Sequence, residues 1–218
     1  MSESLSRSGH QRRAFLRRTA IVPAVLLAPA IAISTQGLTI AAPNRSKQTG
    51  RIFKSIQDHE NDHVHFLKDA LGDLARPMPS FQGLAQKSYS DFVLVSQVLE
   101  NTGVGAYLNA VPAINNPDLL AAAGSIATVE ARHAGVLNIF LDTAITVNNE
   151  SFDTPLTAAQ VVDAAAAFIA DLNGGDALHY DDDPDNASDD NDIDILNFAL
   201  ALEFLEAEFY NINVPMFF

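Results

Sequence analysis

The sequence predicts an all-α protein built around a four-helix bundle. Four segments repeat apolar residues at intervals of three and four positions, which is the spacing of one face of an α-helix. Apolar residues make up 48% of the 218-residue chain and charged residues 18%, which is enough for one domain with a substantial core. The same segments place carboxylates on their apolar faces, and this placement carries the functional prediction.

The composition excludes several classes of function. The chain contains no Cys, so it forms no disulfide, no thiolate metal site and no Cys nucleophile. Its formal net charge of −14 argues against a nucleic-acid partner and fits a soluble acidic protein. No internal repeat is present at the periods typical of solenoid proteins.

The first 32 residues predict an export signal. Arg12 and Arg13 are similar to a twin-arginine motif, an apolar run starts at Ala20, and Ala-Ile-Ala at 30–32 fits a cleavage site. The apolar run is short for a spanning helix, so we expect a cleaved leader and no stable membrane insertion afterwards. The expected destination is the periplasm or cell envelope, and an ordinary secretory leader with a chance Arg pair is the alternative.

A polar linker at 33–50 and a bundle domain at 51–218 follow the signal. The linker has no apolar period, whereas the domain contains four helical segments. The twelve residues GDLARPMPSFQG after the first helix reach about 40 Å when extended, so they can cross the length of a bundle. The predicted helices span 51–71, 89–114, 117–141 and 193–211.

The other two connections differ in length. The second and third helices meet at Asn-Asn-Pro-Asp, with Pro117 at a first helical position, so we expect antiparallel neighbours. A long insert, 142–192, separates the third and fourth helices. We predict that it contains a short helix, capped by Thr157 with an Ala-rich body to Leu172, followed by an acidic loop.

The first and third helices each carry a Glu-x-x-His pair on the apolar face. Glu60 precedes His63 by three positions, and Glu130 precedes His133 by three, so each pair shares one side of its helix. The other residues predicted on these faces are Phe53, Ile56, Leu67 and Ala70 in the first helix, and Leu119, Ala123, Ile126, Leu137 and Phe140 in the third.

The second and fourth helices each carry a Glu followed by a Tyr two turns later. Tyr107 follows Glu100 by seven positions, and Tyr210 follows Glu203 by seven. The other residues predicted on these faces are Tyr89, Val93, Ser96, Gly103, Ala110 and Ile114 in the second helix, and Leu196, Ala199 and Glu206 in the fourth.

Four carboxylates near a bundle axis require a counter-charge, because an unpaired buried carboxylate costs several kcal/mol. The predicted faces offer no Lys or Arg. Two divalent cations balance four glutamates, and two neutral imidazoles complete the ligands. Two Glu plus two Glu-x-x-His pairs form the ligand set of di-iron and di-manganese carboxylate bundles. We therefore expect two iron or manganese ions, with zinc as an alternative, held by Glu60, His63, Glu100, Glu130, His133 and Glu203.

Other residues compete for roles at this site. Glu206 lies in phase with Glu203, in the slot that histidine fills on two other helices, and is a second-tier ligand. Tyr107 and Tyr210 are core aromatics or hydrogen-bond donors to the ligands, with a redox role as the alternative. His59 lies four residues before His63, but a His pair is disfavoured because the third helix has no counterpart at that spacing.

Two further alternatives concern exposed residues. An error of one residue in the helix phase would place both histidines on the surface, with the glutamates solvated. The acidic loop has Asp181, Asp183 and Asp185 alternating as in a calcium loop, but it lacks the Gly and Glu that such loops require. A solvated loop is therefore expected.

Four segments resemble the bacterial exported ferritin-like domain of the desiccation-related type. The resemblance lies in ILNFALALEFLEAEFY, DHENDHVHFLKDALG, VLENTGVGAYLNAVPAI and AAAGSIATVEARHAGVL. It implies a four-helix ferritin-like bundle with the same six ligand residues. In such proteins the LNFAL helix comes first, whereas here it comes last. A circular permutation, a truncated second copy, or completion of a neighbouring chain's bundle would each explain this order.

The leading functional prediction is an exported di-metal carboxylate protein that reacts with dioxygen or peroxide. The alternative is a non-catalytic desiccation-stress scaffold with a structural or empty site, and an envelope-interaction module ranks third. A rubrerythrin-like reductase chain is not expected without Cys, nor is an iron-storing cage without a fifth helix. A homo-oligomer remains open.

Overall fold

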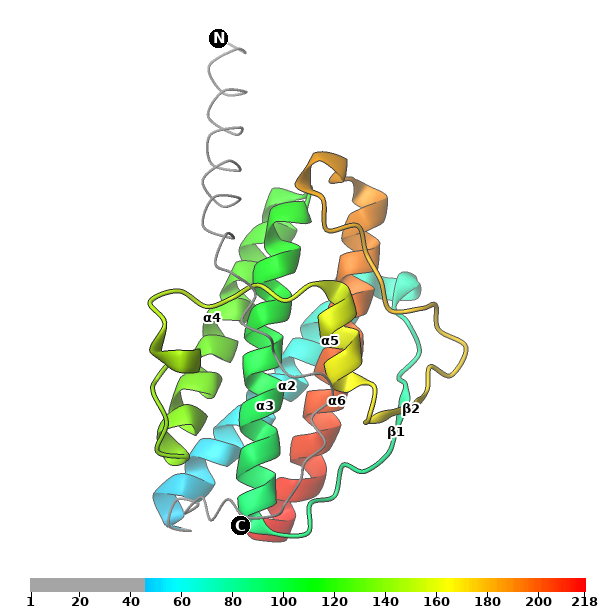
Figure 1. The fold of residues 1–218 in the computed structure, drawn as a ribbon. Coiled ribbons are helices and arrows are strands. Elements are labelled where there is room, and N and C mark those ends of the chain that lie inside the picture. Colours follow the sequence, from blue (N-terminus) through cyan, green and yellow to red (C-terminus); the bar gives the residue numbers. More distant parts are fainter. Residues whose placement is uncertain (1–45) are drawn as a thin grey trace.

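The computed structural model describes residues 46–218, so the predicted export signal and most of the linker lie outside the described part. Four long helices form a bundle (Figure 1). They are α2 (Lys47–Leu71), α3 (Tyr89–Ala110), α4 (Pro117–Phe140) and α6 (Asp189–Phe217). No helix in the described part is long and apolar enough to cross a membrane.

Short elements occupy the connections between the long helices. Between α2 and α3 lie η1 (Gly72–Leu74) and β1 (Ser80–Phe81), and η2 (Val111–Ala113) follows α3. The elements between α4 and α6 are η3 (Val147–Asn149), α5 (Ala158–Ala165), β2 (Ile169–Asp171) and η4 (Pro184–Asn186).

The bundle consists of two antiparallel helix pairs, α2 with α6 and α3 with α4. Gln57 of α2 donates to Asn211 of α6, while His63 lies beside Glu203, so the two helices run in opposite directions. The last helix thus packs within its own chain. Its Leu200 and Phe204 share a buried cluster with Leu67 of α2.

Within each pair, a cluster of amide side chains joins the two helices, and the two clusters match. Gln57 and Asn61 of α2 donate to Asn211 Oδ1 of α6 at 2.8 and 3.1 Å. In the other pair Asn138 of α4 accepts from two side chains of α3 at 2.8 and 3.2 Å, those of Gln97 and Asn101. In each pair the Gln donor lies three residues before a glutamate, Glu60 or Glu100, and the Asn donor lies one residue after it. The same pattern therefore occurs in both pairs.

Three of the long helices differ from the predicted bounds. The helix α3 ends at Ala110, where η2 follows, and not at residue 114. The helix α2 begins inside the predicted linker, because Ser46 accepts from the Thr49 backbone N–H and caps it. The helix α6 begins inside the predicted acidic loop, where Ser188 is the cap, and continues to Phe217. Three Asp residues in its first turn stabilise the helix, because their negative charges lie at the positive end of the helix dipole. On α2, Leu71 rather than the predicted Ala70 is buried.

The insert contains the predicted short helix but also a strand that was not predicted. The capping box of Thr157 and Gln160 starts α5 as expected, yet the helix ends at Ala165 instead of Leu172. The chain beyond it pairs with the crossing connection, as β2 with β1 and as Phe168 O with Gln82 N. This two-stranded ribbon adds a small β element to an otherwise helical fold.

A close approach to α3 fixes the insert to the bundle. The backbone N–H of Leu156 donates to Gly105 O at 2.9 Å, and α5 follows directly. A Cβ at Gly105 would lie 2.5 Å from Leu156 Cγ, so only glycine permits this contact. Val161 of α5 is fully buried.

Candidate metal centre

All six predicted ligand residues are buried near the middle of the bundle. Glu60, Glu100 and Glu130 have no exposed surface, and His63, the most exposed of the six, is 9% exposed. The helical periodicity therefore predicted the correct face on all four helices. None of the buried polar residues in the described part is a Lys or Arg.

The first group of converging ligand atoms surrounds His63. Its Nδ1 lies 3.3 Å from Glu60 Oε2, 3.1 Å from Glu130 Oε1 and 3.3 Å from Glu203 Oε2. One imidazole nitrogen carries at most one proton, so it cannot satisfy three carboxylates by hydrogen bonding. The four ligands come from α2, α4 and α6.

The second group surrounds His133. Its Nδ1 lies 3.0 Å from Glu60 Oε1 and 3.1 Å from Glu100 Oε2, and Glu130 completes the group. Glu60 and Glu130 belong to both groups, whereas Glu100 and Glu203 each belong to one. Each group thus has one imidazole, one carboxylate of its own and two shared carboxylates.

The spacing of these atoms fits ligands around an ion. Metal–nitrogen and metal–oxygen distances of about 2.0–2.2 Å at angles near 90° separate neighbouring ligands by about 3 Å. Both oxygens of Glu60 and both of Glu130 are buried and have no hydrogen-bond partner, although the imidazoles are close. Such carboxylate oxygens are costly unless a cation binds them, so the residues fit two divalent metal ions.

Two tyrosines orient the carboxylates that are not shared. Tyr107 of α3 donates to Glu203 Oε1 of α6 at 2.5 Å, and Tyr210 of α6 donates to Glu100 Oε1 of α3 at 2.6 Å. Each glutamate keeps its Oε2 directed at an imidazole. Both tyrosines are therefore hydrogen-bond donors to predicted ligands, which is one of the two roles expected from the sequence.

Burial and mutual repulsion raise the pKa of the carboxyl groups. The pKa of Glu60 is raised by burial and by Glu130 and Glu100, and that of Glu130 by burial and by Glu100. Burial raises the pKa of Glu100 to about 7. For His63, burial lowers the pKa, but its contacts with the carboxylates of Glu130, Glu203 and Glu60 outweigh burial and raise it. Without metal, the cluster therefore retains protons that a cation would displace.

The second-tier residue Glu206 is buried but belongs to neither group. Burial and the charges of Glu130 and Glu100 raise its pKa. A Cβ at Gly103 of α3 would lie 3.2 Å from Glu130 Oε2 and 3.4 Å from Glu206 Oε1. Gly103 therefore leaves the room that both carboxylates occupy. Glu208 is partly exposed and His65 is exposed.

His59 has a partner that the sequence analysis missed. Its Nδ1 lies 2.9 Å from His133 Nε2, and the two rings stack with their planes 12° apart. The third helix has no histidine four residues before His133, and His59 instead contacts His133 itself. On α4 the position equivalent to His59, four residues before the histidine of the Glu-x-x-His pair, is Val129. Among the described residues, therefore, only one of the two predicted histidine ligands, His133, has a second histidine as a partner.

The acidic loop contains no converging metal ligands. Asp181 accepts from the Asp183 backbone N–H and Asp183 from that of Asp185, as expected of a local turn. Asp192, predicted to be solvated, is instead buried. It accepts from the backbone N–H groups of Asn115 and Asn116 and so ties the start of α6 to the turn between α3 and α4.

Comparison with protein families identifies the family of the chain. The family model of the ferritin-like domain matches residues 29–143 and 191–216, which is more than half of the chain. The chain belongs to the ferritin-like domain family. The residues between the two matched segments, 144–190, lie within the insert of this ferritin-like protein. No curated protein and no solved structure matches the chain.

Proposed function

We propose that this ferritin-like protein binds two iron or manganese ions in its bundle core and reacts with dioxygen or peroxide. The observation that carries the proposal is the set of four buried carboxylate oxygens on Glu60 and Glu130, which lie between two imidazoles without hydrogen-bond donors. Iron and manganese favour oxygen and imidazole ligands, with zinc as the alternative.

The residues of such a centre would have different roles. Glu60 and Glu130, which belong to both groups, would help to hold both ions, while Glu203 with His63 would hold one ion and Glu100 with His133 the other. A bound pair of iron or manganese ions supplies redox chemistry toward dioxygen or peroxide. Tyr107 and Tyr210 hold the outer carboxylates in position through their hydroxyl groups.

Elemental analysis of the purified protein tests this proposal. We expect about two iron or manganese ions per chain, and their loss in Glu130→Ala, because that residue belongs to both ligand groups. Glu208→Ala is the matched control, since Glu208 lies on α6 and is partly exposed. A native protein without metal would overturn the proposal and leave a stress-related scaffold as the better description.

We further propose that the chain is exported to the periplasm or cell envelope. The support is the Arg12-Arg13 pair before an apolar run, in residues outside the described part. Replacing both arginines by lysine should abolish export of a folded reporter fused after residue 50. Unchanged export would favour the ordinary secretory leader.

A further inference from the structure

An apolar cavity lies inside the bundle next to the metal centre. Its volume is about 20 Å³, measured as the space open to the centre of a water-sized sphere. Five alanines line it, which leaves the space unfilled: Ala106, Ala110, Ala122, Ala123 and Ala199. One further lining residue, Phe66, is 43% exposed, so it lies between the cavity and the surface of the bundle.

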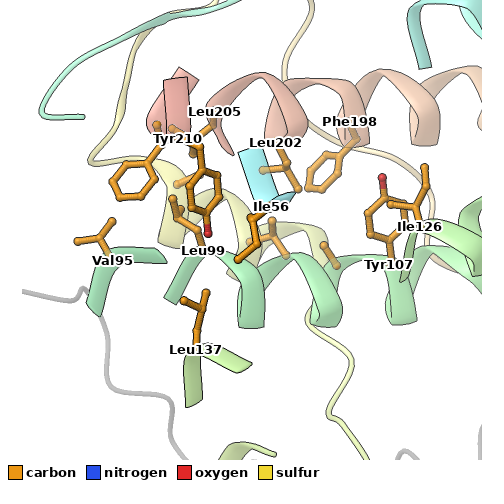
Figure 2. Close-up of a cluster of buried hydrophobic side chains, with 14 of the residues drawn as sticks. Ile56, Val95, Leu99, Tyr107, Ile126, Leu137, Phe198, Leu202, Leu205 and Tyr210 are labelled. Carbon is orange, nitrogen blue, oxygen red and sulfur yellow. The ribbon is translucent and has the colours of Figure 1, made fainter. Parts of the chain in front are cut away.

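The cavity begins one helical turn from the ligands on three helices. Leu67 follows His63 by four positions, Ile126 precedes Glu130 by four, and Ala199 precedes Glu203 by four. Figure 2 shows Tyr107, Ile126, Phe198 and Leu202 gathered in this region. Tyr107 is both a wall of the cavity and the donor to Glu203. Tyr107 therefore connects the cavity wall directly to a ligand carboxylate.

The lining selects against polar molecules. A buried water requires two to four polar partners, and a dry apolar cavity binds apolar gases instead. The Tyr107 hydroxyl is the polar group at this wall, and its proton is donated to Glu203. Hydrogen peroxide would lose its hydrogen bonds on entering, whereas dioxygen has none to lose. The cavity is also too small for a larger apolar ligand.

We propose that this cavity binds dioxygen and delivers it past Tyr107 to the metal centre. The proposal rests on the proposed function, and it names dioxygen rather than peroxide as the oxidant that the protein is built to admit. The alanines on α3, α4 and α6 are then determinants of substrate access and not only of helix packing.

Xenon binding tests the cavity without reference to metal or activity. Xenon is an apolar probe of similar size, so crystals under xenon pressure should show it between Tyr107 and Ala123 in the wild-type protein. Ala123→Leu should fill the space and exclude it. Ala110→Leu fills the same cavity from α3 and serves if the first variant fails to fold. Ala121→Leu, exposed on α4, is the control and should retain xenon.

Oxidation kinetics of the iron(II)-loaded protein test delivery. In Ala123→Leu we expect about two ions per chain as in the wild type. Oxidation by dioxygen should slow by about tenfold or more, while oxidation by peroxide keeps its rate. An unchanged dioxygen rate, or equal slowing with both oxidants, would overturn the proposal. So would wild-type crystals without xenon. Xenon binding by a chain that takes up no metal would overturn delivery and the proposed function, but would leave the gas site.

Discussion

The two ends of the bundle, on either side of the candidate metal centre, are packed in opposite ways. One end is filled with aromatic rings whose centroids lie 4.6–6.5 Å apart. This aromatic end comprises Phe53, Tyr89, Phe92, Phe140, Phe209, Phe217 and Phe218. The other, which we call the alanine end, holds the cavity between Tyr107 and Phe66. Figure 2 shows Tyr107, Ile126, Phe198 and Leu202 from the lining of this cavity.

This difference shows how one bundle can be stable at one end and leave unfilled space at the other. Close-packed rings bury much apolar area and keep water from the carboxylates, which stabilises the fold around a costly charged cluster. A cavity does the reverse, because its walls lose packing contacts. A chain that retains alanine at five lining positions therefore gives up stability at one end while the other end supplies it.

The largest expected effect comes from breaking the aromatic end. Phe92 is fully buried and contacts the rings of Phe53, Phe209 and Phe217. We expect Phe92→Ala to lower the free energy of unfolding by about 3–5 kcal/mol in urea denaturation. Ala110→Leu at the alanine end should change it far less, because the added side chain has a cavity to enter. Equal losses would mean that the two ends are packed alike.

The buried carboxyl groups between the two ends should make the stability of the protein depend on pH. The pKa of Glu100 is raised from 4.5 to about 7 in the folded protein, so the folded state binds this proton more tightly than the unfolded state. Its contribution is complete below pH 4.5 and is lost as the pH rises to about 7, a change of about 3 kcal/mol for the metal-free protein. Denaturation of chelator-treated protein across this window would measure the loss.

The variant Glu100→Gln provides the control for this pH dependence. It removes one titrating group, so the slope should fall by the contribution of one proton, while the slope from Glu60, Glu130 and Glu206, whose pKa values are also raised, remains. In the metal-loaded protein the trend should reverse, because metal binding requires deprotonated carboxylates and strengthens as the pH rises. An unchanged slope in Glu100→Gln would show that Glu100 does not contribute to it.

A smaller effect would distinguish the two ligand groups. His59 supports only His133, through a 2.9 Å contact between ring nitrogens. We expect His59→Phe to weaken binding of one of the two ions by about 10- to 100-fold, because a residue that orients a ligand has effects of this size. Calorimetric titration with cobalt(II) would resolve the two steps. The exposed His65→Phe is the control, and equal weakening of both ions would refute the asymmetry.

The smallest expected effect concerns the room beside the shared carboxylate. In Gly103→Ala the new methyl group would lie 3.2 Å from Glu130 Oε2, so this oxygen must shift and metal affinity should fall. Gly124→Ala meets no atom within 4 Å and should stabilise the protein by about 1 kcal/mol through helix propensity alone. Thermal unfolding with and without metal measures both, and equal gains would show that Gly103 has no role in the site.

Helical periodicity was sufficient to predict the face of each long helix and hence the six buried ligand residues. Residues such as Glu60 and His63 share a face by local geometry, so their spacing predicts a common direction. The turn at Pro117 and the cap at Thr157 were predicted for the same reason. The strand Ile169–Asp171 was missed because its partner, Ser80–Phe81, is about ninety residues away in the chain.

The sequence by itself determined that four amphipathic helices carry carboxylates and imidazoles into one core. Only the tertiary structure decided how these side chains meet: Glu60 and Glu130 in both ligand groups, Tyr107 donating across to Glu203, and His59 stacked on His133. It alone also shows the difference between the ends, filled by rings around Phe92 and hollow beside Ala123. The physical reason is that the side a residue faces follows from local backbone geometry, whereas contacts between helices and unfilled space depend on packing among distant parts of the chain.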